Sequence, residues 1–339
     1  MVDLRSQQQA RARVPAAVPT AAPAAPLSRS LTSALLDPGA NATAYLDEAA
    51  VEFLSPLRGE SGKLEMAFRT PEARVAEKAS SAGATPIYQG DSGTEAGRGA
   101  LAPSEPGIYQ IAVELGKARR AVERLSLVTL VPFSQKRGSK IGLYYLGNWP
   151  YEGGEKPRSP AYANPPGFVE VTRENQSERV SEHFKLADFL TKDQRDVWPK
   201  YLVIDPKLID KLELVIQELE AQGHPVRHVQ IMSGFRTPYY NHAGGNTGGR
   251  ANLSRHMYGD AADVFVDNDR NGSMDDLDGD GRVDVRDAEV VARAAERVEA
   301  AHPALVGGVG IYKACCGHGP FTHVDVRGYR ARWRGEGSG

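Results

Sequence analysis

The sequence predicts an α+β protein that is preceded by a small β module and a disordered N-terminal tether. Three observations support this prediction. Residues 1–40 are rich in alanine, proline, serine and arginine and contain hardly any aromatic residues. Residues 107–150 contain apolar runs of strand length, and beyond Phe168 strand patterns occur together with two capped helix patterns.

The N-terminal part divides into segments of different composition. Residues 1–40 cannot bury enough apolar surface to offset the entropy lost on ordering, so we expect a disordered tether. Residues 41–156 give mixed signals and include the β module. The proline-rich residues 157–167 are expected to form a stiff linker at a domain boundary. The strand-like runs of the β module are residues 108–115, 125–131 and 141–146.

Two helices are expected in the C-terminal half. Asp205 can cap a helix that begins at Pro206 and stops at Gly223, because apolar residues recur between them at helical spacing. Asp287 is expected to cap a second helix over residues 288–301. The strand patterns of this half are residues 229–232, 262–266, 309–312 and 321–326.

The bulk composition excludes several kinds of partner. Lysine and arginine number 41 and aspartate and glutamate 43, so no net positive field attracts nucleic acid or an anionic membrane. The apolar runs fall short of the ~20 residues that a membrane-spanning helix needs, and no transmembrane segment is expected. The opening residues 1–13 lack the apolar core of a signal peptide. Cys315 and Cys316 fit buried thiols, a vicinal disulfide or a redox-sensitive pair.

A set of metal-binding residue types recurs in the C-terminal half. His256 and Asp263 are separated by a glycine that permits a tight turn, which can bring both side chains to one ion. His323 and Asp325 lie in a strand pattern, so they project to the same face and Asp325 can orient the imidazole. A single histidine is more often a core or surface residue. Two imidazoles and one carboxylate together predict a catalytic zinc site with an open fourth position.

The joint pattern resembles the zinc D-Ala-D-Ala carboxypeptidase family. Residues 254–263 match its S-x-H-x-x-G-x-A-x-D motif, and residues 323–325 match its H-x-D motif. The resemblance extends to residues 233–236 with Asn241 downstream. It covers roughly residues 180–333, including the looser matches at residues 180–184 and 307–312.

The resemblance implies a compact α+β fold, shared with lysostaphin-type peptidases and the hedgehog signalling domain, in which a small antiparallel sheet flanked by helices carries zinc. Residues 168–334 would form this domain. The ligands implied for one catalytic Zn²⁺ are His256, Asp263 and His323. Arg236 matches the family arginine that stabilises the developing oxyanion or holds substrate. Ser254 either hydrogen-bonds substrate or fixes the loop.

The general base departs from the family pattern. Dipeptidase members place a glutamate three residues before the last ligand, where this chain has Pro320. Phe321 replaces a histidine that some endopeptidases carry. His318 matches the catalytic histidine of the carboxypeptidase branch and can exchange a proton near neutral pH. Its glycine-flanked loop also fits an incidental residue.

An acidic segment at residues 267–287 separates the two metal motifs. Its second part has oxygen side chains at positions 1, 3, 5, 9 and 12 and glycine at position 6, the pattern of an EF-hand calcium loop. An earlier loop repeats the spacing and shares residues with it, so we expect one or two structural Ca²⁺ ions. A solvated acidic loop is the alternative. The expected calcium residues are Asp276, Asp278, Asp280, Arg282, Asp284 and Asp287, with Asp267, Asp269 and Asn271 in the earlier loop.

The resemblance implies a zinc metallopeptidase that hydrolyses peptide bonds in peptidoglycan stem peptides or cross-links, as a D,D-carboxypeptidase or an endopeptidase. Its partners would be peptidoglycan or muropeptides, and its location the periplasm or outside the cell, with a leader removed or replaced. One alternative is a non-catalytic wall- or partner-binding module that retains the metal fold. Another is that the β module acts as an adhesion or scaffold domain that positions the peptidase.

Overall fold

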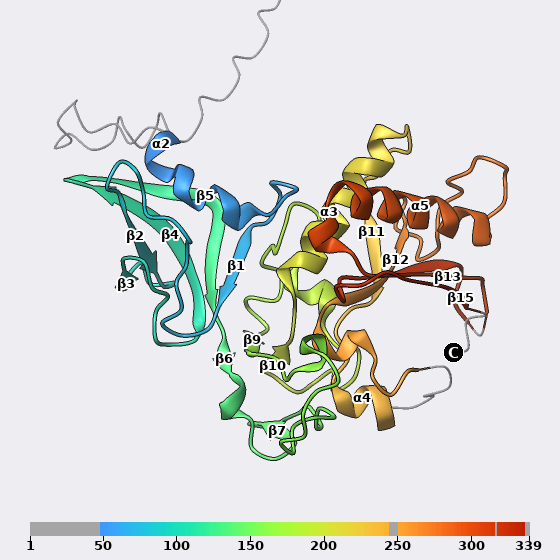
Figure 1. The fold of residues 1–339 in the computed structure, drawn as a ribbon, viewed down its shortest axis with the longest axis horizontal. Helices are drawn as coiled ribbons and strands as arrows, with labels where there is room; N and C mark the ends of the chain where they lie inside the picture. Colours follow the sequence, from blue (N-terminus) through green and yellow to red (C-terminus); the bar gives the residue numbers. More distant parts are fainter. Residues whose placement is uncertain (1–47, 244–249, 316, 336–339) are drawn as a thin grey trace, which may run out of the picture. The chain divides into compact units, whose positions relative to one another are not determined.

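The computed structural model describes residues 48–243, 250–315 and 317–335. The predicted tether of residues 1–40 lies outside them. The described chain combines two five-stranded sheets, smaller sheets and a few helices (Figure 1). The α+β class is therefore confirmed. No helix among the described residues is long and apolar enough to cross a membrane.

The first five-stranded sheet has the strand order β1-β5-β4-β2-β3. Its buried side chains pack with helix α2 (Glu48–Val51) and the 3-10 helix η1 (Glu52–Arg58). The sheet begins before residue 107, so the predicted β module of residues 107–150 omits its first three strands. These strands lack a clear alternating pattern, because β1 to β3 are short and β3 is largely exposed. The strands are β1 (Met66–Arg69), β2 (Thr85–Gln89), β3 (Glu95–Arg98), β4 (Gly107–Leu115) and β5 (Ala118–Thr129).

Short elements connect this sheet to the rest of the chain. The proline-rich residues 157–167 contain the 3-10 helix η3 (Pro160–Tyr162), and Arg255 donates a hydrogen bond of 2.7 Å from Nη1 to the Ala161 carbonyl oxygen. A domain boundary there stays a prediction. The other elements of this part are β6 (Val131–Pro132), η2 (Phe133–Gln135), β7 (Lys140–Ile141), β8 (Tyr144–Tyr145), β9 (Gly167–Val171), η4 (Leu186–Phe189) and β10 (Lys200–Leu202).

The second five-stranded sheet has the order β11-β12-β14-β13-β15. Its four predicted strands are confirmed, whereas β15 was not predicted. β15 pairs in parallel with β13, so the sheet is mixed rather than the antiparallel sheet that the resemblance implied. The sequence of β15 gives no clear strand signal, because the strand has only five residues and two of them are arginines. The strands are β11 (Val229–Ser233), β12 (Ala261–Val266), β13 (Gly308–Tyr312), β14 (Phe321–Asp325) and β15 (Ala331–Gly335).

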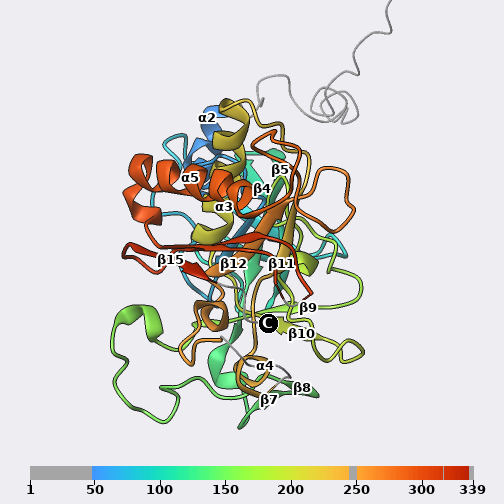
Figure 2. The ribbon, with the colours of Figure 1, turned by 90° about the vertical axis from the view of Figure 1, so that its right-hand side faces the viewer.

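Two helices pack on one face of this sheet. α3 (Pro206–Ala221) is confirmed, with Asp205 accepting a hydrogen bond from the Lys207 amide. α5 (Val285–Ala301) begins earlier than predicted, because Asp284 is its N-cap and Asp287 completes a capping box in the first turn. α3 and α5 pack together, and α5 covers β13 and β14 (Figures 1 and 2). The remaining helices are α4 (Pro238–Ala243), η5 (Arg255–Tyr258) and η6 (Pro303–Leu305).

Gly259 sets the turn between η5 and β12. Its backbone is left-handed at φ 69°, and a Cβ atom there would lie 2.3 Å from the Val203 carbonyl oxygen. The Gly259 carbonyl oxygen accepts a hydrogen bond from the Asp205 amide at 2.9 Å. This turn therefore needs glycine for its conformation and for the close approach of the residue 203–205 backbone.

We predict that Gly259→Ala destabilises the protein more than Gly223→Ala does. Gly223 also has a positive φ of 87°, but no atom lies within 4 Å of its added Cβ, so alanine there should cost about 1 to 2 kcal/mol of unfolding free energy. At residue 259 the backbone overlap adds a cost of about 1 to 3 kcal/mol. Urea unfolding of both variants measures the difference. Equal losses would show that the Val203 contact has no effect.

Candidate metal centre

A row of residues crosses the second sheet, with one residue from each strand. The register pairs Asp263 of β12 with Ser233 of β11 and with His323 of β14. Gly310 of β13 pairs with His323 and with Trp333 of β15. Directly paired residues project to the same face of a sheet. The hydroxyl of Thr322, the neighbour of His323, donates to α5, so the row stands on the face away from that helix.

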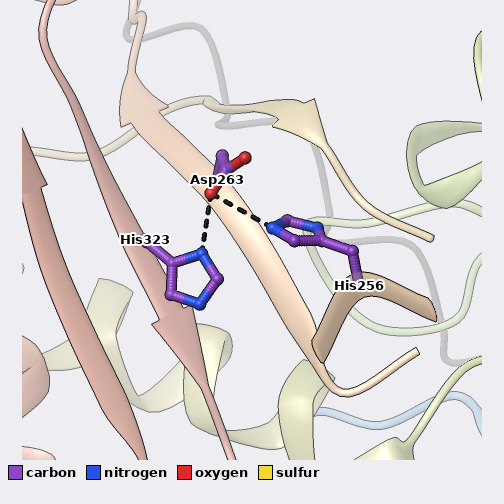
Figure 3. A group of neighbouring side chains, drawn as sticks. All are labelled: His256, Asp263 and His323. Atoms are coloured by element: carbon purple, nitrogen blue, oxygen red, sulfur yellow. Dashed lines mark hydrogen bonds and ion pairs between the residues drawn. The ribbon is translucent and has the colours of Figure 1, made fainter. Parts of the chain in front are cut away.

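His256 reaches this face from the 3-10 helix η5, and not from a strand. The turn at Gly259 joins η5 to β12 and folds the imidazole back over Asp263. Figure 3 shows His256, Asp263 and His323 converging from η5, β12 and β14. All three residues are buried.

The three side chains present one ligand atom each to a common point. Asp263 Oδ1 lies 2.8 Å from His323 Nδ1 and 3.3 Å from His256 Nε2. One ligand atom from each residue lies within 4.8 Å of the other two. Two imidazole nitrogens and a carboxylate oxygen at this spacing form a donor set suited to Zn²⁺. The structure thus brings together the three residues that the sequence predicts as ligands.

The outward-facing nitrogen of each imidazole has a hydrogen-bond acceptor. His256 Nδ1 lies 2.7 Å from the Gly234 carbonyl oxygen, which can only accept, so this nitrogen carries the proton. His323 Nε2 lies 3.1 Å from Asp325 Oδ2. In His256 this partner leaves Nε2 with a lone pair for a metal. His323 Nδ1 shares its proton with Asp263 Oδ1 and would release that proton on binding a metal.

Asp325 is held by several donors besides His323. Its Oδ1 accepts hydrogen bonds from the amides of Gly308 at 2.7 Å and Arg327 at 3.1 Å. The Arg327 guanidinium also pairs with both carboxylate oxygens. Although burial alone would raise the pKa of Asp325, its bonds to His323 and Arg327 lower it below the usual range. Asp325 is therefore an anion at neutral pH and a fixed acceptor for the His323 proton.

The two histidines have opposite electrostatic environments. Burial is the main reason that the pKa of His256 falls to about 4, and the Arg236 charge lowers it further. Burial also disfavours the charged form of His323, but hydrogen bonds to Asp263 and Asp325 raise its pKa to about 9. Burial opposes ionisation of Asp263, yet the neighbouring histidines and Arg236 bring its pKa well below the usual value. These neighbours thus keep the Asp263 carboxylate ionised between the two imidazoles.

Arg236 contacts the metal centre directly. Its Nη2 donates to Asp263 Oδ2 at 2.6 Å and its Nε donates to the Ser233 hydroxyl at 2.8 Å. The Arg236 amide donates to the His256 carbonyl oxygen at 3.1 Å, which ties its loop to η5. The side chain of Arg236 is 16% exposed, so it is not fully enclosed.

Ser254 and His318 lie around the centre. Ser254 precedes η5, is buried, and accepts a hydrogen bond from the Met257 amide with its carbonyl oxygen. His318 is half-buried, and its ring packs edge-on against Phe321, whose side chain shares the face of His323. His318 Nδ1 lies 2.8 Å from the Gly319 carbonyl oxygen. Cys315 is disulfide-bonded, and Cys316 lies outside the described residues.

The acidic segment forms two groups that share no residue. The first contains Asp267, Asp269 and Asp275, and the second contains Asp276, Asp278 and Asp287. In the first loop Asn271 donates to Asp269 Oδ2 at 2.8 Å, and in the second the Arg282 amide donates to Asp280 Oδ1 at 2.9 Å. The sequence patterns of the two loops overlap, but the two groups of side chains are separate.

Arg286 has a place in the second loop that the sequence did not reveal. Its guanidinium pairs with Asp280 and lies 2.9 Å from Asp284 Oδ2. Two of the expected calcium residues therefore contact a cationic side chain and are not part of the cluster.

Three further residues approach the centre and were not predicted as site residues. Trp333 packs its ring against that of His323 with centroids 5.1 Å apart, and its Nε1 donates to the Tyr312 hydroxyl. The charges of Arg236 and Asp263 act on Lys192, although burial is the main reason that its pKa is lowered. The short strand β15 gives no alternating pattern that would have placed Trp333 in the site.

A family model described as peptidoglycan L,D-endopeptidase MepK matches residues 168–275. This result confirms the resemblance to zinc D-Ala-D-Ala carboxypeptidases for that part of the chain. The match includes Arg236, His256 and Asp263 and ends before His323, which the sheet register brings to the same place. No curated protein and no solved structure matches the chain.

We predict that Asp325→Asn weakens zinc binding without removing it. The amide keeps the shape of the side chain but removes the charge that holds the His323 proton, and loss of such a partner costs about 10-fold to 100-fold in metal affinity. Competition with a chelator of known affinity measures the change. His318→Ala is the matched control and should bind zinc like the parent. Parental affinity in Asp325→Asn would contradict the role given to this carboxylate.

Proposed function

We propose, from the premise that residues 168–275 belong to a peptidase family of the peptidoglycan L,D-endopeptidase type, that this protein is a zinc-dependent endopeptidase acting on peptidoglycan. The observation that carries the proposal is the convergence of His256, Asp263 and His323 with both outer imidazole nitrogens already bonded. Both imidazoles direct an inner nitrogen at the Asp263 carboxylate, which is the arrangement that three ligands of one ion require.

The donor set fits zinc in its catalytic form. His256, Asp263 and His323 would supply three protein ligands, and the fourth position would stay open. Bound zinc would polarise the scissile carbonyl group and make a water molecule acidic enough to attack it. The surrounding residues have the tasks of holding the ligands, directing the substrate and moving protons.

Arg236 is proposed to hold the substrate carbonyl oxygen while it helps position Asp263. Two of its donors are bound to Ser233 and Asp263. No acceptor among the described residues binds the other N–H groups of its guanidinium, so these can contact substrate. Ser254 is proposed to fix the η5 loop through its backbone. A permanently charged, planar donor group suits a carbonyl oxygen that gains negative charge.

His318 is proposed as the group that exchanges the proton. The Gly319 carbonyl oxygen can only accept, so His318 Nδ1 carries the hydrogen and Nε2 is left as an acceptor. No hydrogen bond to Nε2 is recorded within residues 48–243, 250–315 and 317–335. Nε2 can take the proton of the attacking water and return it to the leaving amine, so the proton balance of hydrolysis closes. Pro320 cannot perform this task.

The substrate class follows from the family match. L,D-endopeptidase activity implies cleavage of peptide cross-links between stem peptides of peptidoglycan, and we propose this reaction rather than carboxypeptidase trimming. Such a substrate lies in the cell envelope, so we propose a periplasmic or secreted protein.

We also propose that the acidic segment binds one or two Ca²⁺ ions with a structural role. Asp287 is buried, and its carboxylate accepts backbone hydrogen bonds from Leu277 at 2.7 Å and Asp284 at 2.8 Å. Mutual repulsion within each acidic group would be relieved by a cation. The loop leads directly from β12 into α5, so an ion there would stabilise the connection between them.

The first prediction from this function concerns cleavage. The zinc-loaded protein should cleave purified cross-linked muropeptides, a chelator should stop cleavage, and His256→Ala should be inactive and zinc-poor. Arg236→Ala should keep zinc and lose about 100-fold to 1000-fold in kcat. His318→Ala should lose about 100-fold to 10,000-fold. Mass spectrometry of the products measures all of these effects.

The exposed Arg297→Ala is the matched control for the arginine variant, because Arg297 pairs with Glu218 between the helices. Parental turnover in His318→Ala would move the proton transfer to another group. If the fully zinc-loaded parent protein cleaves no muropeptide, the proposed endopeptidase activity is wrong and a non-catalytic binding module is favoured.

The second prediction concerns calcium. Calcium should raise the melting temperature, and at about 100 times the dissociation constant the gain is about 2.7 kcal/mol. Asp276→Asn with Asp278→Asn should abolish the response, whereas Arg286→Gln should strengthen it because a competing cation is removed. Differential scanning calorimetry compares calcium with a calcium-selective chelator. If the melting temperature is the same in calcium and in the chelator, the acidic segment is merely solvated and binds no calcium.

A further inference from the structure

Tyr312 stands at the edge of the metal centre in a fixed orientation. It lies on β13 two residues beyond Gly310, so its side chain projects to the same face as the row of His323 and Trp333. Its ring stacks on Phe321 with centroids 4.4 Å apart and planes at 7°. On the other side the ring lies directly over Gly335, where an added Cβ would be 2.1 Å from Cε1. The ring is thus confined between β14 and β15.

The hydroxyl group of Tyr312 is directed toward the metal row. Trp333 pairs with Gly310 beside His323, and its indole Nε1 lies 2.7 Å from the Tyr312 oxygen. Gly310 makes room for this indole, because a Cβ there would lie 2.3 Å from the Trp333 ring. The tyrosine side chain therefore leans along β13 toward His323, and the indole connects the two residues.

The hydrogen bond leaves the Tyr312 proton available. An indole N–H can only donate, so the Tyr312 oxygen accepts from Trp333 and its own O–H is free to donate elsewhere. Within the described residues no acceptor for this O–H is recorded. Tyr312 as a whole is only half-buried, so its side chain is not sealed inside the sheet.

The charges around Tyr312 keep it a neutral donor. Burial raises its pKa above the ordinary value, the bond from Trp333 lowers it, and the charge of Asp263 raises it. The charge of Arg236 acts in the opposite sense to that of Asp263, and Arg327 reinforces Arg236. Tyr312 therefore keeps its proton at neutral pH.

We propose that Tyr312 is a catalytic residue whose hydroxyl group donates a hydrogen bond to the carbonyl oxygen of the scissile peptide bond. This inference rests on the proposed function. As water adds to the carbonyl carbon, the oxygen gains negative charge and the hydrogen bond strengthens, while the Tyr312 proton stays on its own oxygen. Arg236 has two donors engaged with Ser233 and Asp263, whereas the Tyr312 O–H is uncommitted. Trp333 is a positioning residue that orients this hydroxyl group.

The test is Tyr312→Phe in the full zinc-loaded chain with cross-linked muropeptides as substrate. The variant keeps the stacked ring and removes the donor, so kcat should fall about 100-fold to 1000-fold with little change in KM. Binding of a phosphinate analogue of the scissile peptide should weaken by a similar factor, because it presents the charged tetrahedral oxygen. Zinc content should stay parental. Tyr109→Phe, in the first sheet, is the matched control and should act like the parent.

Trp333→Phe separates the donor from its support. The variant should lower kcat by itself, but it should have almost no further effect when combined with Tyr312→Phe, because both changes remove one interaction. Parental kcat in Tyr312→Phe, or losses from the two variants that simply multiply, would overturn the proposal while leaving the proposed function intact. A parent protein that cleaves no muropeptide would overturn both.

Discussion

The register between β12 and β14 is the constraint on which the metal centre depends. Asp263 and His323 are direct partners, and a slip of one residue would turn one of them to the opposite face of the sheet. The helix side of the sheet resists such a slip. Ala262 and Val324 are paired and fully buried there, and the Thr322 hydroxyl group donates to the Ala288 carbonyl oxygen of α5 at 2.7 Å. The apolar core thus determines where the polar face presents its ligands.

A second buried network supports the same strand from behind. Lys211 of α3 is fully buried, and its ammonium group donates to Glu299 of α5 at 2.6 Å and to the Asp325 carbonyl oxygen at 2.8 Å. Burial lowers the pKa of Lys211, and the contact with Glu299 opposes that effect. Lys211 therefore links both helices to the end of β14, where the Asp325 side chain holds the His323 proton. Removing either partner would leave a buried charge without compensation.

The sequence predicts the centre better than its surroundings. Local motifs identify His256 and Asp263, because one short turn joins them, and periodicity places α3 to within two residues of its ends. The parallel strand β15 was missed because its pairing with β13 is a tertiary event without a local signal. The contacts of Trp333 and Tyr312 depend on that pairing, so these residues could not be assigned to the site. The start of α5 was misplaced because both Asp284 and Asp287 have capping chemistry.

The chain between β12 and β14 runs through the acidic loops, α5 and β13, and returns beside the end of β12. Val264 is paired with Thr322, so β12 and the start of β14 are held together whatever the length of the chain between them. Lengthening a closed loop costs free energy only with the logarithm of its length. A new segment can therefore be inserted between β12 and β14 while the paired residues of these two strands stay in position. The acidic loops lie in this part of the chain, and the family match at residues 168–275 ends within them. The acidic loops are thus an accessory that the architecture accommodates without moving the metal centre.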